Sequence, residues 1–242
     1  MKKVILSVSV MLFSMGAFAQ WNSSDVYQLG DDNASGVSQV GQYNYSSVEQ
    51  LGDENVATVI QVGGYNDSDI LQIGDGNDAS VDQMGNDNTA IQYQNGLGNV
   101  AMVEQDGAEN YSEQYQYGFN NYASVSQTGG NNYAGQLQVG YSNEAIATQI
   151  GCENESVQIQ YGTINLAVNY QEGNGNYAGS LQDGFWNWSF ITQLGNHNDA
   201  LTLQYGDVHT SVVTQIGDGN SSIVYQNNGP MGPANPCTDC ND

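Results

Sequence analysis

The acidic residues with the most regular spacing are Asp31, Asp53 and Asp75, which lie 22 residues apart. If the chain returns to the same corner after each such interval, these carboxylates stack about 4.8 Å apart. At that distance each pair repels by roughly 0.9 kcal/mol even in water. Calcium would relieve the repulsion, because hard cations take several oxygen ligands. The alternative is that they are turn residues that add solubility, and their loops do not match the nine-residue calcium-binding repeat.

The histidines and cysteines offer little further chemistry. His197 and His209 fall in or beside predicted bends, where polar residues are expected. No nucleophile, base and orienting acid share a plausible pocket, so the sequence predicts no enzyme. Cys237 and Cys240 form a C-x-x-C pair. A local disulfide is expected there, because structural zinc needs four ligands and a redox pair needs a thioredoxin-like fold. Cys152 is expected to project from a bend as an isolated thiol.

Glutamine carries the strongest pattern, because it recurs every eleven residues without insertion or deletion. The glutamines are Gln28, Gln39, Gln50, Gln61, Gln72, Gln83, Gln94, Gln105, Gln116, Gln127, Gln138, Gln149, Gln160, Gln171, Gln182, Gln193, Gln204, Gln215 and Gln226. Glycine follows two residues after all but the last, and only Ala or Ser stands seven residues after each of the first eighteen. Asparagine stands five residues after each, except at His209 and Met231. Every second one forms the row Asn33, Asn55, Asn77, Asn99, Asn121, Asn143, Asn165 and Asn187. A polar pattern kept through so many copies means that each unit is shaped by its neighbours in a stack.

Each eleven-residue unit predicts one strand and one bend. From each asparagine to the next glutamine the residues alternate in character, which predicts a strand of about seven residues. Gly-x-x-Asn predicts a four-residue bend with positive φ values. The parity that holds Ala or Ser and the glutamine is predicted to face a narrow interior, since its first position tolerates nothing larger than Ser. There the glutamine and asparagine amides would pair with identical residues one coil away, because an unpaired buried amide is costly.

The outward residues indicate that the true repeat is 22 residues long. Immediately before every second glutamine they are mostly large and apolar, as at Tyr93, Tyr115, Leu137 and Ile159, whereas before the others they are mostly polar. Two strands per coil therefore belong to two different sheets. The predicted fold is all-β, a β-solenoid of about nine and a half coils stacked in a cross-β-like manner and about 45 Å long.

The two ends of the chain differ from the repeats. Residues 1–19 hold Lys2 and Lys3, an apolar run and Ala17-Phe18-Ala19, which predicts a secretory signal peptide too short for a membrane span. The mature chain from Gln20 then has 26 acidic groups and no Lys or Arg, which excludes nucleic acid as a partner. The solenoid is expected over residues 20–226. The tail, residues 227–242, holds all three prolines and is expected to end the stack, since proline cannot donate to a ladder.

The motif Gln-x-Gly-x-x-Asn-x-Ala-x-x-x-Gln, found from Gln116 to Gln127 and from Gln193 to Gln204, resembles the curlin repeat of bacterial curli fibre subunits. The resemblance implies export through the periplasm of a Gram-negative-type bacterium and polymerisation into functional amyloid of the biofilm matrix. It also implies curli-type secretion and nucleation proteins as partners. The chain departs from the family in having more coils, no basic residue in its mature part and only a short segment, residues 20–25, before the repeats.

Self-assembly is the predicted function, because the end coils would expose unpaired strand edges that act as templates for the next subunit. Two rival functions stay open. One is a monomeric solenoid that presents a regular face to ice or a mineral, although Thr192 with Thr214 is a short threonine row for that purpose. The other is a calcium-loaded cell-surface component, which cation-dependent folding would reveal. No cofactor other than calcium is expected.

Overall fold

The computed structural model describes residues 21–228, which form nineteen β-strands. One sheet contains β1 (Ser23–Leu29), β3 (Tyr45–Leu51), β5 (Asp67–Asp75), β7 (Thr89–Leu97), β9 (Tyr111–Phe119), β11 (Tyr133–Tyr141), β13 (Glu155–Thr163), β15 (Tyr177–Phe185), β17 (Asp199–Tyr205) and β19 (Ser221–Asn227). The other contains β2 (Ala34–Gln42), β4 (Val56–Gly64), β6 (Asp78–Asn86), β8 (Val100–Ala108), β10 (Tyr122–Gly130), β12 (Glu144–Cys152), β14 (Leu166–Asn174), β16 (Trp188–Leu194) and β18 (Thr210–Ile216). No helix of membrane-spanning length and hydropathy occurs between residues 21 and 228. The predicted signal peptide lies outside the described residues.

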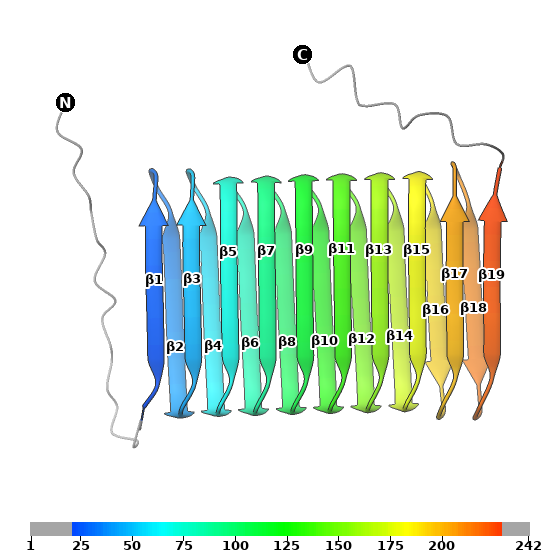
Figure 1. Cartoon of the computed structure of the whole chain (residues 1–242), viewed down its shortest axis with the longest axis horizontal. Coiled ribbons are helices and arrows are strands. Elements are labelled where there is room, and N and C mark those ends of the chain that lie inside the picture. Colours follow the sequence, from blue (N-terminus) through cyan, green and yellow to red (C-terminus); the bar gives the residue numbers. More distant parts are fainter. Residues whose placement is uncertain (1–20, 229–242) are drawn as a thin grey trace, which may run out of the picture.

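The chain alternates between two sheets of parallel strands, one with ten strands and one with nine. The two sheets face each other along the long axis of the molecule (Figure 1). Each strand pairs with the strand two further along the chain, in a register that never changes. Gln116 pairs with Gln138 in the ten-stranded sheet, and Gln127 pairs with Gln149 in the nine-stranded sheet. The predicted all-β solenoid with two strands in each 22-residue coil is therefore confirmed.

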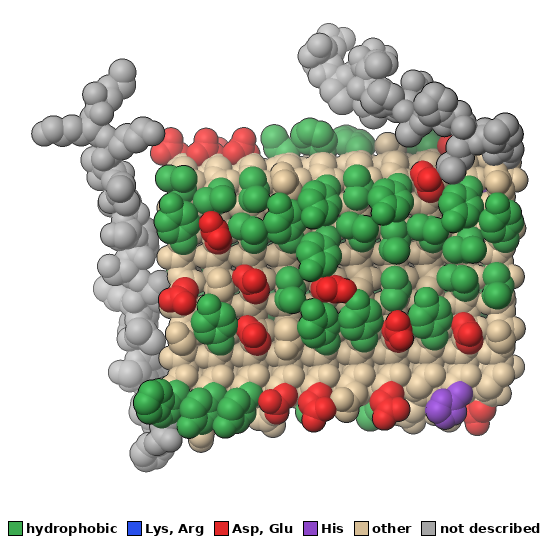
Figure 2. Space-filling model, viewed as in Figure 1, with side chains coloured by type: hydrophobic (Ala, Val, Ile, Leu, Met, Phe, Trp, Pro, Cys, Tyr) green, Lys and Arg blue, Asp and Glu red, His purple; other side chains and the backbone are tan. Residues whose placement is uncertain are grey.

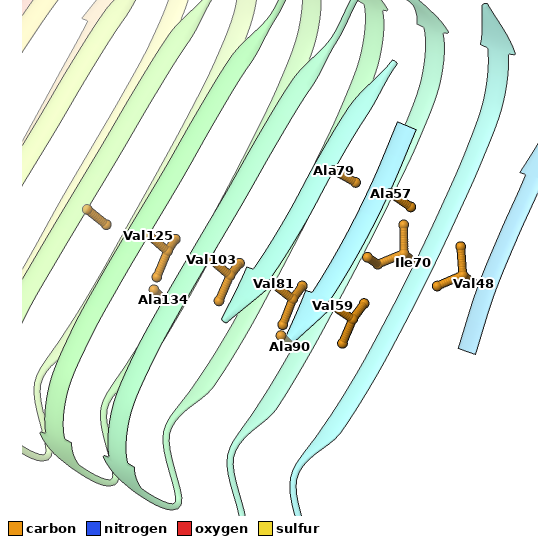
Figure 3. Close-up of a cluster of buried hydrophobic side chains, with 11 residues drawn as sticks. Val48, Ala57, Val59, Ile70, Ala79, Val81, Ala90, Val103, Val125 and Ala134 are labelled. Atoms are coloured by element: carbon orange, nitrogen blue, oxygen red, sulfur yellow. The ribbon is translucent and has the colours of Figure 1, made fainter. Parts of the chain in front are cut away.

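The interior between the sheets is narrow and built in rows. The Ala/Ser row is buried from Ser46 to Ser211, and Ala123 is 0% exposed. Beside it, successive strands of the nine-stranded sheet contribute Val59, Val81, Val103 and Val125, which follow one another along the stack (Figure 3). Valine at four successive levels of this sheet lets these coils pack alike along the stack.

The bends are shorter than the sequence predicts, and the expectation of four residues is wrong in most coils. Strand β9 runs through Gly118 to Phe119 and leaves only Asn120 and Asn121 before β10. Gly118 has a φ of 112° and Asn120 a φ of 53°. The chain therefore changes direction at these two residues, of which Gly118 is still part of strand β9. The glycine thus turns the backbone while the chain around it still pairs with the next coil, as Gly118 does with Gly140.

Candidate functional site

The regular spacing of the glutamines produces two continuous rows of amides, one on the inner face of each sheet. Gln94 Nε2 donates to Gln116 Oε1, and Gln116 Nε2 donates to Gln138 Oε1, each over 2.9 Å. The same bond joins every described glutamine of the eleven-residue series to the one 22 residues on, from Gln28 to Gln226 in the ten-stranded sheet and from Gln39 to Gln215 in the other. Gln50 through Gln215 are buried, whereas Gln28, Gln39 and Gln226 at the ends are half-buried.

Each repeat glutamine from Gln39 onward also makes a hydrogen bond that links the two sheets. The second hydrogen on Gln116 Nε2 goes to the backbone oxygen of Val100, at 2.9 Å, and that on Gln127 Nε2 to the backbone oxygen of Tyr111, at 3.0 Å. Val100 begins a strand of the nine-stranded sheet, while Gln116 lies in the ten-stranded one. One amide therefore makes a bond along the axis, a bond across the coil and, through its oxygen, a bond to the coil before.

The asparagine rows run beside the bends, and their side-chain hydrogen bonds point along the stack in the direction opposite to those of the glutamines. Both the backbone amide and Nδ2 of Asn121 donate to Asn99 Oδ1, each over 3.1 Å. Asn121 Nδ2 also donates to the backbone oxygen of Gly140 in the next coil, at 3.1 Å. This arrangement recurs along the row from Asn33, which is half-buried, through the buried Asn187. Glutamine donors thus face the C-terminal end of the stack, while these asparagine donors to Oδ1 face the N-terminal end.

Sequence reasoning missed a second glutamine row in the middle of the ten-stranded sheet. Gln92 donates to Gln114, Gln114 to Gln136 and Gln136 to Gln158, over 2.9, 2.8 and 2.7 Å. These side chains take the interior position held by valine elsewhere and are at most 2% exposed. Their spacing of 22 residues on the interior parity was a signal that could have identified them. Beyond Gln158 the same row continues with Ser180, whose Oγ donates at 3.0 Å to Oδ1 of Asn169 in the facing nine-stranded sheet.

Two of the three aspartates of the suggested cation corner, Asp53 and Asp75, accept hydrogen bonds between coils. Asp53 Oδ1 accepts a hydrogen bond from the backbone amide of Asp31 at 2.7 Å, and Asp75 Oδ1 accepts one from the amide of Asp53 at 2.9 Å. At an equivalent bend Asn174 Oδ1 accepts from the amide of Cys152 at 3.0 Å, so a neutral amide performs the same task. No group of three or more His, Cys, Asp and Glu within residues 21–228 is arranged to hold a metal ion. Calcium binding at this corner stays a prediction.

The other reactive side chains are dispersed. His197 is exposed in a bend with a φ of 54°, and His209 is half-buried with its Nε2 3.0 Å from the backbone oxygen of Tyr205. Cys152 is an exposed free thiol. The pair Cys237 and Cys240 lies outside the described residues, and its disulfide stays a prediction.

The two sheets end in strand edges without a neighbour among the described residues. Strands β1 and β2 form one end of the stack, and β18 and β19 form the other. None of these four strands contains the Lys or Pro that commonly protects an exposed edge from pairing with another chain. Each end therefore offers two rows of backbone donors and acceptors together with the ends of the amide rows.

The outer face of the ten-stranded sheet carries a row of large apolar side chains. Tyr93, Tyr115, Leu137 and Ile159 are in register on neighbouring strands and half-buried. Figure 2 shows this face with its apolar side chains along the stack and scattered acidic ones between them. The described residues contain no Lys or Arg to pair with these acids.

Comparison with protein families identifies the repeat. The model of the curlin associated repeat matches residues 22–52, 52–85 and 181–201. The resemblance to the curlin-repeat family that the sequence suggested is thereby confirmed. No curated protein matches the chain in sequence.

Proposed function

Because this chain contains curlin associated repeats, we propose that it is a secreted structural subunit that self-assembles into extracellular, curli-like amyloid fibres of a biofilm matrix. Its role is mechanical and adhesive rather than catalytic. The partners proposed for it are further copies of itself, together with secretion and nucleation proteins of the curli type.

The observation that carries this proposal is the open end of the stack. A coil added at either end would meet the same unpaired strand edges and amide rows that each interior coil meets on both sides. Parallel in-register strands with glutamine and asparagine rows are the arrangement that makes cross-β fibres stable, because identical residues satisfy each other at every level. Growth by end-to-end addition therefore extends the interior packing of the subunit without any new kind of contact.

The rival surface-binding function has less support. A crystal-binding face needs a regular array of small polar side chains, and Thr192 and Thr214 are in register on neighbouring strands. The next outward residue in that row is Tyr170, which pairs with Thr192 and interrupts it. The apolar row on the ten-stranded sheet instead suits lateral contacts between filaments or with other surfaces.

The proposal is tested with the purified mature chain, residues 20–242, at micromolar concentration near pH 5 in moderate salt. We expect unbranched fibres in electron microscopy that bind amyloid dyes and give diffraction spacings of about 4.8 and 10 Å. Fibre fragments are expected to seed fresh protein. A chain that remains monomeric for days under these conditions refutes the proposal.

A matched pair of edge variants makes the test sharper. Val26 in β1 is half-buried and packs against the interior cluster, whereas the adjacent Tyr27 is exposed. Val26→Lys puts a charge into the interior at the terminal coil, a device that prevents edge pairing. Val26→Lys should fold but fail to elongate, and Tyr27→Lys should still form fibres. Equal fibre formation by both variants would mean that this end is not a growth surface.

A further inference from the structure

The number of strands constrains how two subunits can join. This inference rests on the proposed self-assembly. The described residues hold nineteen strands, so β1 and β19 both belong to the ten-stranded sheet. If a second copy set its β1 on β19 without rotation, the nine-stranded sheet would lack one strand between β18 and the second copy's β2. The junction would then expose the interior of half a coil.

The two halves of each coil have the same backbone geometry. Gly118 and Asn120 turn the chain out of the ten-stranded sheet with φ values of 112° and 53°. Gly129 and Asn131 turn it out of the nine-stranded sheet with φ values of 118° and 55°. Both sheets also place glutamine and Ala or Ser at the same interior positions. A half-turn about the long axis, with a shift of half a coil, therefore brings one sheet into the position of the other.

We propose that successive subunits in the fibre are related by a half-turn about the fibre axis. The added copy's β1 pairs with β18, and its β2 pairs with β19, so that every sheet position is filled across the junction. The ten-stranded sheet of one subunit thus continues into the nine-stranded sheet of the next. The occupant of each open end is a second copy of this chain in this one orientation.

The glutamine amides at the two ends match this junction. Gln215 and Gln226 each use one Nε2 hydrogen, on the backbone oxygens of Asp199 and Thr210, at 2.8 and 2.9 Å. The second hydrogen on each has no acceptor among the described residues. At the other end Oε1 of Gln28 and Oε1 of Gln39 likewise receive no donor from the described residues, although the Nε2 of each donates to the next coil.

With the half-turn both pairs are completed, because Gln215 meets Gln28 of the added copy and Gln226 meets Gln39. Without rotation only Gln226 finds a partner, in Gln28. Gln215 and Gln39 then face the missing strand and leave a donor and an acceptor unpaired in the interior, which is unfavourable. The hydrogen-bonding groups at the ends therefore favour the rotated junction.

The asparagine rows are compatible with the rotated junction. In the interior each Oδ1 accepts from the asparagine one coil further on, as Asn198 Oδ1 does from Asn220. In the rotated junction Asn33 of the added copy follows Asn220, and Asn22, whose Nδ2 is buried without a partner, follows His209. The Nε2 of His209 lies against the backbone oxygen of Tyr205, which leaves Nδ1 of the neutral ring as an acceptor.

The half-turn changes the surface of the whole fibre. The apolar row of the ten-stranded sheet would face opposite sides in successive subunits, so that both sides of a fibre could take part in lateral contacts. With about 4.8 Å per coil, nine and a half coils advance the fibre by about 46 Å per subunit, and equivalent points recur on the same side after about 91 Å.

Disulfide trapping across the junction distinguishes the two arrangements. The background carries Cys152→Ser, Cys237→Ser and Cys240→Ser, and Ser38→Cys is combined with Tyr225→Cys. These outward residues become neighbours only in the rotated junction, at a Cα separation of about 4.8 Å that a disulfide can bridge. The control combines Tyr27→Cys with Tyr225→Cys, which become neighbours only without rotation.

We expect oxidised fibres of the Ser38/Tyr225 pair to give a ladder of covalent oligomers on a non-reducing gel and the Tyr27/Tyr225 pair to stay largely monomeric. The reverse pattern, or fibres in which neither pair is trapped, overturns the half-turn while leaving the proposed function intact. If the parent chain forms no fibres, both the proposed function and the half-turn fail.

A label on the native thiol gives a second measurement that needs no substitution at the junction. Cys152 is exposed at the end of β12, and gold can be attached to it in a Cys237→Ser, Cys240→Ser chain. We expect labels to alternate between the two sides of single filaments, with about 91 Å between labels on one side. Labels along one side at about half that spacing overturn the proposal.

Discussion

Each repeat glutamine from Gln50 to Gln204 makes at least three hydrogen bonds with its side-chain amide. Gln116 accepts from Gln94 and donates both to Gln138 and to the backbone of Val100. A leucine at this position would fill most of the space but remove all three bonds, so that Gln138 Oε1 loses its donor and one Nε2 hydrogen of Gln94 loses its acceptor. The position therefore requires an amide and not merely a side chain of that size.

Gln116→Leu should destabilise the stack by about 1 to 3 kcal/mol for each partner left unpaired, and should slow or abolish assembly. Tyr115→Thr changes the adjacent outward residue and should leave thin fibres with altered bundling. Denaturation curves and electron microscopy of the two variants provide the measurement. If Tyr115→Thr prevents folding while Gln116→Leu is silent, the assignment of inside and outside must be reversed.

Removing a polar group from the Ala/Ser row should have the opposite effect on stability to removing the Gln116 amide. Oγ of Ser68 is buried without a hydrogen-bond partner, and other coils hold alanine at the same position, as at Ala90. Ser68→Ala should raise the free energy of unfolding by about 1 kcal/mol, because a buried hydroxyl without a partner is unfavourable. Ser180→Ala is the control, since Ser180 Oγ donates to Asn169 and its loss should be destabilising. A stability loss at Ser68 equal to that at Ser180 would contradict this account.

The bends are the elements on which the stacking distance depends. At Gly118 a Cβ atom would lie 2.1 Å from the backbone oxygen of Gly140, and the φ of 112° is one that other residues rarely adopt. The neighbouring coils therefore approach at the bend through backbone alone. At Gly36, within β2, a Cβ would meet nothing within 4 Å.

Gly118→Ala should cost about 2 to 6 kcal/mol, from backbone strain together with displacement of the next coil. Gly36→Ala should be neutral or slightly stabilising, because glycine weakens a strand interior. Thermal unfolding of both variants measures the difference. Similar melting temperatures for the two would show that the bend accommodates a side chain.

At the scale of the whole molecule, the excess of acidic side chains affects both assembly and stability. Residues 20–242 have 26 acidic side chains and no Lys or Arg, so subunits are expected to repel one another at neutral pH. Burial, together with the charge of Asp69, raises the pKa of Asp67. The folded state therefore binds a proton at Asp67 more readily than the unfolded state does, and this contribution to stability grows as the pH falls. On the same face the Tyr133 hydroxyl donates a hydrogen bond to the Glu113 carboxylate. Burial, together with this carboxylate, raises the pKa of Tyr133.

Assembly should be several-fold slower at pH 7.5 in low salt than near pH 5, and added salt at pH 7.5 should recover part of the rate by screening. Above about pH 10 the folded state should lose stability, because tyrosines ionise in the unfolded chain while Tyr133 resists ionisation. Dye-binding kinetics and circular dichroism across pH measure both effects. An assembly rate independent of pH and salt would show that repulsion between subunits is unimportant.

Calcium offers a separate comparison for the corner formed by Asp31, Asp53 and Asp75. If a cation binds there, calcium should accelerate assembly more than magnesium at equal ionic strength. The triple Asp→Asn variant should keep the hydrogen bonds to the backbone amides and lose the calcium effect. Equal effects of both cations on the unmodified chain would leave only screening.

The sequence by itself determined the fold class, the 22-residue repeat and the division of strands between two sheets, because a stack of identical units repeats its local rule at every level. Glycine, asparagine and glutamine at fixed positions sufficed for this. The interior rows were also accessible from the sequence wherever one residue type filled a position. The row from Gln92 to Gln158 was missed because valine, alanine and serine hold the equivalent position elsewhere.

Only the tertiary structure decided how neighbouring coils meet. The sequence could not show that strands such as β9 continue through glycine, that glutamine and asparagine donate in opposite directions or that Asp53 accepts from the amide of Asp31. Each of these depends on the distance and offset between coils, which bend geometry and backbone pairing set together. The matching groups at Gln28 and Gln215 likewise emerge only when both ends of the stack are seen in one object, because they lie at opposite ends of the chain and never touch within it.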